Sequence, residues 1–152
     1  MIKRMPLAEI YPIMTEVLST GGEFKMITAG TSMLPMLRDR KDTAVFVEPT
    51  FPLRKYDVIL YRRKDGSFVL HRIVGKDQFG YILCGDNQYF YEHGIKDNQV
   101  IAELSAYIKD GKRVECTSFK NRFYSFFHCN FRFVRQRLSH IKGKLKKIIS
   151  GT

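Results

Sequence analysis

The sequence predicts a mainly β protein, a twisted antiparallel sheet or barrel with one helix before it and one after it. Between residues 24 and 117, short runs rich in β-branched and aromatic residues alternate with polar turns. On either side of this region, apolar residues recur at helical spacing. With 152 residues and 44% apolar content, the chain is long enough for one domain with its own core.

The first helix is expected over about residues 6–20, where the apolar residues are Leu7, Ile10, Met14, Val17 and Leu18. Pro12 has no backbone N–H, so the regular helix is expected to start there, with proline in its first turn. Gly21 and Gly22 are typical of a helix end.

Seven strands are expected in the β core, at 24–28, 43–48, 57–62, 67–75, 81–85, 100–109 and 113–117. The turns at 63–66 and 109–111 are typical of hairpins, because an Asp-Gly pair tolerates positive φ. The stretch from 85 to 99 is interpreted as a break between strands. Together with the first helix, these strands define a predicted domain of residues 1–117.

Residues 118–152 are interpreted as a basic amphipathic helical tail. Nine of the 26 Lys and Arg residues lie in 117–152, which contains no Asp or Glu. From Phe127 to Ile148 the apolar residues step by three and four. Residues 119–149 therefore predict either a helix packed on the sheet or a helix lying on an anionic membrane surface. The helical spacing favours lipid over nucleic acid as the partner.

The cysteines and the hydropathy pattern limit the remaining classes of protein. Cys84, Cys116 and Cys129 show no CxxC spacing, so neither a disulfide framework nor a zinc site is predicted, and no cofactor is expected. No apolar run is long enough to span a bilayer, and no secretory signal precedes the first helix. A cytoplasmic protein, peripheral on a membrane, is expected.

Three motifs contain residues that can do chemistry. The first, Gly30-Thr31-Ser32-Met33-Leu34-Pro35, follows a predicted strand. A serine between a glycine bend and a proline-limited exit can be held exposed, with its own N–H pointing into a cleft, which suits a nucleophile. Most serines in such turns only cap the chain.

The second and third motifs supply a base and a carboxylate. His71 lies on the return strand of a predicted hairpin, where a neutral imidazole can take a proton from a serine. Asp86, in Gly85-Asp86-Asn87, follows the next strand and can orient an imidazole. The alternatives are a structural histidine and an ordinary turn.

The order and spacing of these motifs resemble those of the type I signal peptidases over roughly residues 24–108. The match is closest to the branch of the endoplasmic reticulum, archaea and some Gram-positive bacteria, in which histidine replaces the usual lysine. The related LexA-like peptidases share the serine region but use a lysine base. In this chain His71-Arg72 stands where a Lys-Arg would be expected in the branch that uses a serine and a lysine.

The resemblance implies a serine endopeptidase of the signal-peptidase and LexA-like fold that cleaves a leader or signal peptide after small residues. Ser32 would form an acyl-enzyme, with His71 as base and then acid. The loop of Gly30, Thr31, Met33 and Pro35 would hold the nucleophile, and the Ser32 N–H would bind the oxyanion. Many relatives carry a serine where this chain has Gly30. Relatives also place an acidic residue after the third motif, so Glu92 and Asp97 are alternatives to Asp86 as the third member.

Two other functions stay open at this stage. One is a catalytically inactive relative that binds peptides or recruits partners to a membrane. The other is a LexA-like regulator, which is disfavoured because only about 23 residues precede the catalytic region and they show no DNA-binding helices. An active enzyme with an ordinary histidine base should gain rate through roughly pH 6–7. A rise only above about pH 8 would indicate a lysine such as Lys55 or Lys76.

Overall fold

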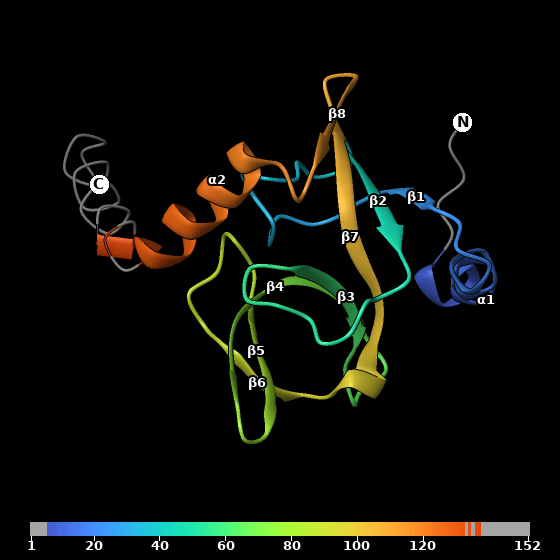
Figure 1. The fold of residues 1–152 in the computed structure, drawn as a ribbon, viewed down its shortest axis with the longest axis horizontal. Helices are drawn as coiled ribbons and strands as arrows, with labels where there is room; N and C mark the ends of the chain where they lie inside the picture. The colour runs from blue at the N-terminus through green and yellow to red at the C-terminus, as the bar shows by residue number, and fades with distance from the viewer. Residues whose placement is uncertain (1–5, 133, 135, 138–152) are drawn as a thin grey trace, which may run out of the picture.

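The computed structural model describes residues 6–132, 134, 136 and 137. These residues form an antiparallel sheet with one α-helix before it and one after it (Figure 1). The strands are β1 (Phe24–Ile27), β2 (Thr43–Val47), β3 (Val58–Arg62), β4 (Phe68–Asp77), β5 (Gly80–Cys84), β6 (Glu92–Ile95), β7 (Val100–Lys109) and β8 (Lys112–Glu115). The helices are α1 (Leu7–Ser19), the short 3-10 helix η1 (Asp97–Gln99) and α2 (Phe119–Asn130). The predicted fold class is confirmed.

The long strand β7 organises the sheet. The strand order is β1-β2-β7-β3-β4-β5-β6. β2 pairs along one edge of β7, while β3 and β8 pair with its first and second halves. Because β1 and β6 stand at opposite ends of this order, the sheet curves without closing into a barrel (Figure 1).

Both Asp-Gly turns form the hairpins that the sequence predicts. The first joins β3 to β4, with Gly66 at φ +87°. The second joins β7 to β8, with Asp110 at φ +50° and Gly111 at φ +75°. In the second turn both residues have positive φ, which matches the right-handed twist of the paired strands, whereas in the first turn only Gly66 does.

Two local predictions were wrong. α1 starts at Leu7 and continues through Pro12 instead of beginning there. Its Met14 and Leu18 are buried in the core, and this packing outweighs the one backbone hydrogen bond that proline removes. The stretch from 85 to 99 contains β6, which pairs with β5. Its sequence, Glu-His-Gly-Ile, gives no strand signal because tertiary pairing decides its conformation.

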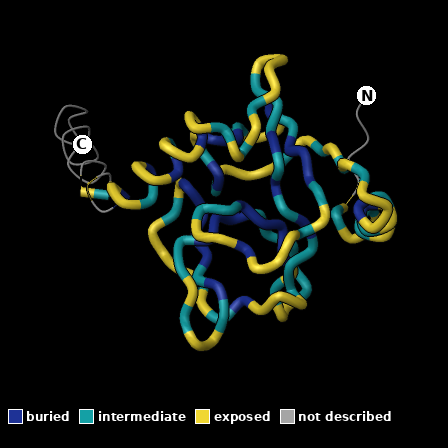
Figure 2. Tube along the Cα trace, in the orientation of Figure 1, coloured by how far each residue is buried: buried dark blue, intermediate teal, exposed yellow. Residues whose placement is uncertain are grey.

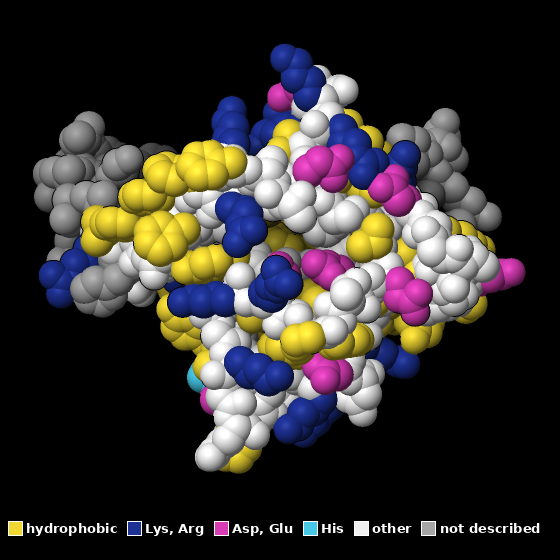
Figure 3. Space-filling view, viewed as in Figure 1, with side chains coloured by type: hydrophobic (Ala, Val, Ile, Leu, Met, Phe, Trp, Pro, Cys, Tyr) yellow, Lys and Arg dark blue, Asp and Glu magenta, His cyan; other side chains and the backbone are white. Residues whose placement is uncertain are grey.

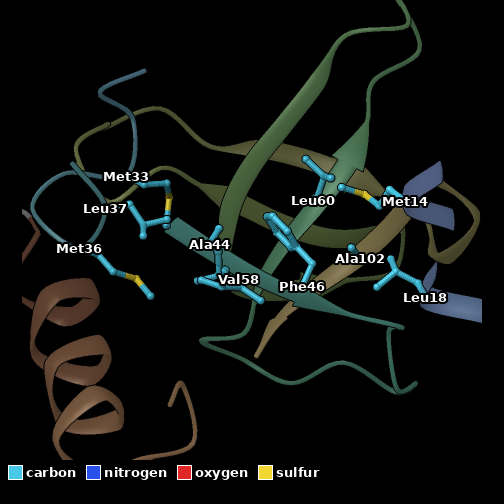
Figure 4. Packing of buried hydrophobic residues seen from close by; sticks show 11 residues of the cluster. Met14, Leu18, Met33, Met36, Leu37, Ala44, Phe46, Val58, Leu60 and Ala102 are labelled. Carbon is cyan, nitrogen blue, oxygen red and sulfur yellow. The ribbon is translucent and has the colours of Figure 1, made fainter. Parts of the chain in front are cut away.

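The larger of two hydrophobic clusters connects the sheet, α1 and the loop that follows β1. Figure 4 shows Met33, Met36 and Leu37 of that loop beside Ala44 and Phe46 of β2. All three loop side chains are buried. Along residues 28–42, buried residues alternate with exposed and partly exposed ones, as in the colouring by residue burial of Figure 2. The loop that carries Ser32 is therefore fixed by its apolar residues, while the positions between them face outward.

The predicted helical tail over 119–149 is described only as far as α2 and a few residues after it. Leu138, Ile141, Leu145 and Ile148 lie outside the described residues. Phe127, Phe131 and Val134 are each more than 40% exposed, so packing of the apolar stripe on the sheet is wrong for these residues. Within the described part of the chain, neither helix combines the length and apolar character needed to cross a membrane.

Candidate active site

Ser32 lies in a tight turn between β1 and β2. Gly30 adopts φ +104°, a conformation that favours glycine, and its N–H donates to Asp39 Oδ1 at 2.7 Å. Ser32 is partly exposed, between the exposed Thr31 and the buried Met33. Among the described residues, no group accepts a hydrogen bond from the Ser32 N–H. The turn therefore leaves Ser32 partly exposed, with a backbone N–H that has no acceptor among the described residues.

His71 is held in β4, opposite Ile59 of β3, with its side chain only 2% exposed. Its Nδ1 lies 3.2 Å from Glu92 Oε1 and 3.3 Å from the Tyr61 hydroxyl. Because a carboxylate only accepts hydrogen bonds, this geometry assigns the ring proton to Nδ1. The lone pair is then on Nε2, which has no hydrogen-bond partner among the described residues.

Ser32 and His71 line the same cavity, which has a volume of about 310 Å³. Arg63 and Gln88 contribute polar groups to its wall, and the rest is mostly apolar: Leu7, Met26, Met33, Leu37, Phe46, Leu60, Phe68, Val69 and Leu70. The Ser32 hydroxyl and the His71 ring make no direct hydrogen bond in the described structure. None of the described lysines lines this cavity, so neither Lys55 nor Lys76 is placed to act as the base.

Burial dominates the protonation of His71. Loss of hydration lowers the pKa of its imidazole to about 4, although the neighbouring Glu92 carboxylate acts in the opposite direction. The ring is therefore neutral, and able to accept a proton, well below pH 6. The pH range of 6–7 that the sequence predicts for the rise in rate assumes an ordinary histidine, and with this lowered pKa we expect the rise near pH 4 instead.

Glu92, at the start of β6, supplies the carboxylate that contacts His71. Arg63 holds it from the other side, with Nε 2.7 Å from Oε2 and Nη2 2.5 Å from Oε1. This paired contact lowers the pKa of Glu92 and keeps the carboxylate charged beside the imidazole. The sequence names Glu92 only as one alternative, because β6 itself carries no recognisable strand pattern.

Asp86, the preferred third member from the sequence, has a different set of partners. It is buried and accepts two parallel hydrogen bonds from Arg72, at 2.8 Å each, and one from the Tyr124 hydroxyl at 3.2 Å. The Arg72 guanidinium lowers the pKa of Asp86 against the opposing effect of burial. This geometry does not support Asp86 as the group that orients His71, and a buried ion pair with Arg72 replaces that interpretation. Asp97, in η1, does not line the cavity.

The residues around Asp86 brace the serine turn directly. The Asn87 N–H donates to the Ser32 carbonyl at 2.7 Å, and its side-chain amide donates to the Thr31 carbonyl at 3.2 Å. A Cβ at Gly85 would lie 2.7 Å from the Ser32 carbonyl, so only glycine fits this approach. The third motif therefore holds the backbone of the turn that carries Ser32.

No protein-family model and no curated protein matches this chain. The resemblance to signal peptidases accordingly remains a prediction from the three motifs. Among the described residues, no cluster of His, Cys, Asp and Glu side chains could hold a metal ion. The cysteines of the described chain are free thiols, and burial raises the pKa of Cys84.

Proposed function

We propose that this protein is a serine endopeptidase in which Ser32 is the nucleophile, His71 the general base and Glu92 the carboxylate that orients the base. The observation that carries the proposal is the shared cavity. A partly exposed serine and a buried histidine line it, and the histidine is held through Nδ1 by a charged carboxylate. Such an arrangement leaves Nε2 to accept a proton from the nucleophile.

In the proposed reaction, Ser32 Oγ attacks the carbonyl carbon of the scissile peptide bond while its proton passes to His71 Nε2. The Ser32 N–H donates to the oxygen on which negative charge develops. His71 then gives the proton to the leaving nitrogen as the C–N bond breaks, which leaves an acyl ester on Ser32. A water molecule, deprotonated by His71, hydrolyses that ester and regenerates the serine.

The substrate class follows from the resemblance and from the size of the cavity. A volume of about 310 Å³ is at the small end of the range for ligand sites, which is compatible with cleavage after small residues. We place the activity in the cytoplasm, at a membrane face. Leader or signal peptides accessible from that side are the proposed substrates.

The alternative function is a catalytically inactive relative that binds peptides or recruits partners to a membrane. Two observations favour it. The Ser32 hydroxyl makes no direct hydrogen bond to His71 in the described structure, and Gly30 lacks the hydroxyl that many relatives place there as a second oxyanion donor. Losing one such donor costs about 3 kcal/mol of transition-state stabilisation.

Covalent labelling with a fluorophosphonate probe separates the two functions. We expect the purified full chain to be labelled at one site, with labelling abolished in Ser32→Ala and strongly reduced in His71→Ala. His93→Ala is the matched control, because His93 is an exposed histidine outside this cavity and should leave labelling unchanged. Labelling that persists in Ser32→Ala refutes the proposed nucleophile. A chain that resists the probe but binds peptides is the inactive relative.

A further inference from the structure

α2 packs on the protein through its polar side. Asn121, Ser125 and His128 are buried, whereas a helix at a domain surface usually buries its apolar residues. Ser125 Oγ accepts a hydrogen bond from Arg72 at 2.8 Å, and His128 Nε2 lies 2.8 Å from the Asp86 carbonyl oxygen. These contacts determine which face of the helix points outward.

The outward side is a continuous aromatic surface, here called the Phe ridge: Phe119, Phe123, Phe126, Phe127 and Phe131. Each of the five is between 41% and 85% exposed. Neighbouring rings contact one another along the helix, and Phe127 and Phe131 are stacked. Figure 3 shows this hydrophobic ridge along α2, at the left of the view. An exposed patch of this kind on a protein surface is characteristic of a docking site.

The charge around the Phe ridge indicates which kind of partner binds there. Lys120 and Arg122 are exposed on the same helix, and residues 117–152 contain nine basic and no acidic residues. A second copy of the chain would bring an equally basic segment against this one, which like-charge repulsion opposes. A bilayer with anionic headgroups instead offers apolar depth for the rings and negative charge for the cations.

We propose that the Phe ridge docks on an anionic membrane surface, with α2 lying in the plane of the headgroups. Aromatic rings favour this depth, because the boundary between headgroups and acyl chains accommodates flat apolar groups. The inner side of α2 stays bound to Arg72 and Asp86 during docking. The surface is independent of the catalytic chemistry proposed above, so membrane binding is expected to survive loss of the nucleophile.

Vesicle sedimentation tests this proposal. The full chain is mixed with phosphatidylcholine vesicles that contain about 30% phosphatidylglycerol, and in parallel with vesicles of phosphatidylcholine alone. We expect binding to the anionic vesicles to be at least about tenfold stronger, and to weaken in about 0.5 M salt. Ser32→Ala should bind as the parent does.

The variant Phe119→Ser/Phe123→Ser removes the two most exposed rings of the ridge, and we expect its vesicle binding to fall at least about tenfold. Phe79→Ser is the matched control, because Phe79 is an exposed ring in the turn between β4 and β5. It should bind vesicles as the parent does. Circular dichroism confirms that each variant is folded. Lys120→Gln/Arg122→Gln keeps the rings and should reduce only the preference for anionic lipid.

Three results would overturn the proposal. The first is equal sedimentation of the parent chain with both kinds of vesicle. The second is unchanged vesicle binding by folded Phe119→Ser/Phe123→Ser. The third is a ridge-dependent dimer in light scattering, or ridge-dependent binding of a single-stranded oligonucleotide, in a chain that does not bind anionic vesicles.

Discussion

Replacing Asp86 by asparagine distinguishes a structural role for this residue from a catalytic one. Asp86 and Arg72 are both essentially inaccessible to solvent and share two parallel hydrogen bonds of 2.8 Å. Asp86→Asn keeps the shape but leaves the Arg72 guanidinium buried without its counter-charge. Removing one partner of a buried pair costs about 3–5 kcal/mol. Since domains of this kind are stable by about 5–15 kcal/mol, we expect a large loss of stability.

Urea unfolding followed by circular dichroism measures this loss, and Glu92→Gln is the matched comparison. Glu92 keeps some solvent access, so Glu92→Gln should change stability by about 1 kcal/mol. It should nevertheless slow probe labelling of Ser32 on the order of a hundredfold or more, because the imidazole loses its orienting carboxylate. Two results together would reverse the roles given to Asp86 and Glu92. The first is an Asp86→Asn variant that unfolds like the parent but is not labelled. The second is a Glu92→Gln variant that is labelled at the parent rate. The apolar double replacement Arg72→Met/Asp86→Leu should regain most of the lost stability, since no charge is then left buried alone.

Two further predictions concern the serine turn and the imidazole. Gly85→Ala places a methyl group 2.7 Å from the Ser32 carbonyl oxygen, so we expect slower probe labelling of Ser32 and a lower thermal unfolding midpoint. Gly21→Ala is the control, because the space around its Cβ is open. It should change the midpoint only through its positive φ and leave labelling unaffected. Burial lowers the pKa of His71 to about 4 from an unfolded value near 6.5, so the unfolded chain binds more protons between these values and stability falls as the pH drops through them. This one group should remove about 2 kcal/mol by pH 5, measured as the difference in urea stability between pH 7 and pH 5, and His71→Asn should abolish that part of the pH dependence. Parallel pH dependences in the parent and His71→Asn would show that the imidazole titrates normally.

The parts of the fold that could be predicted are those with local causes. The two Asp-Gly hairpins follow from backbone preferences of two adjacent residues, and the flanking strands follow from their β-branched and aromatic content. β6 could not be predicted in this way, because Glu92 and His93 are ordinary loop residues until β5 offers them a partner. At Pro12 the local sequence predicted a helix start that the structure does not have. The helix already begins at Leu7, because burial of Met14 and Leu18 outweighs the effect of the proline.

The site shows the same division. The motifs pointed to Ser32 and His71, and the two residues line one cavity in the structure. The choice between Asp86 and Glu92 could not be made, because it depends on how far β5 carries the chain before β6 returns to pair with it. Two residues after β5, Asp86 meets Arg72, whereas Glu92 returns with β6 to contact His71. The burial of the polar side of α2 could not be predicted either. Its buried side chains Ser125 and His128 contact Arg72 of β4 and the Asp86 carbonyl after β5, and these partners are far away in the sequence.

Arg72 explains physically why the three motifs occur together. It follows His71 in β4, so its side chain leaves the opposite face of the strand. There its guanidinium contacts groups from four other segments: the Asp86 carboxylate, the Tyr56 carbonyl, the Met36 sulfur and the Ser125 hydroxyl. Asp86 in turn adjoins Asn87, whose N–H holds the Ser32 carbonyl. The serine turn and the histidine strand are thus connected through one buried ion pair, and the planar, five-donor guanidinium is the side chain able to make these contacts at once. The relative placement of Ser32 and His71 therefore depends on residues outside the cavity that those two side chains line.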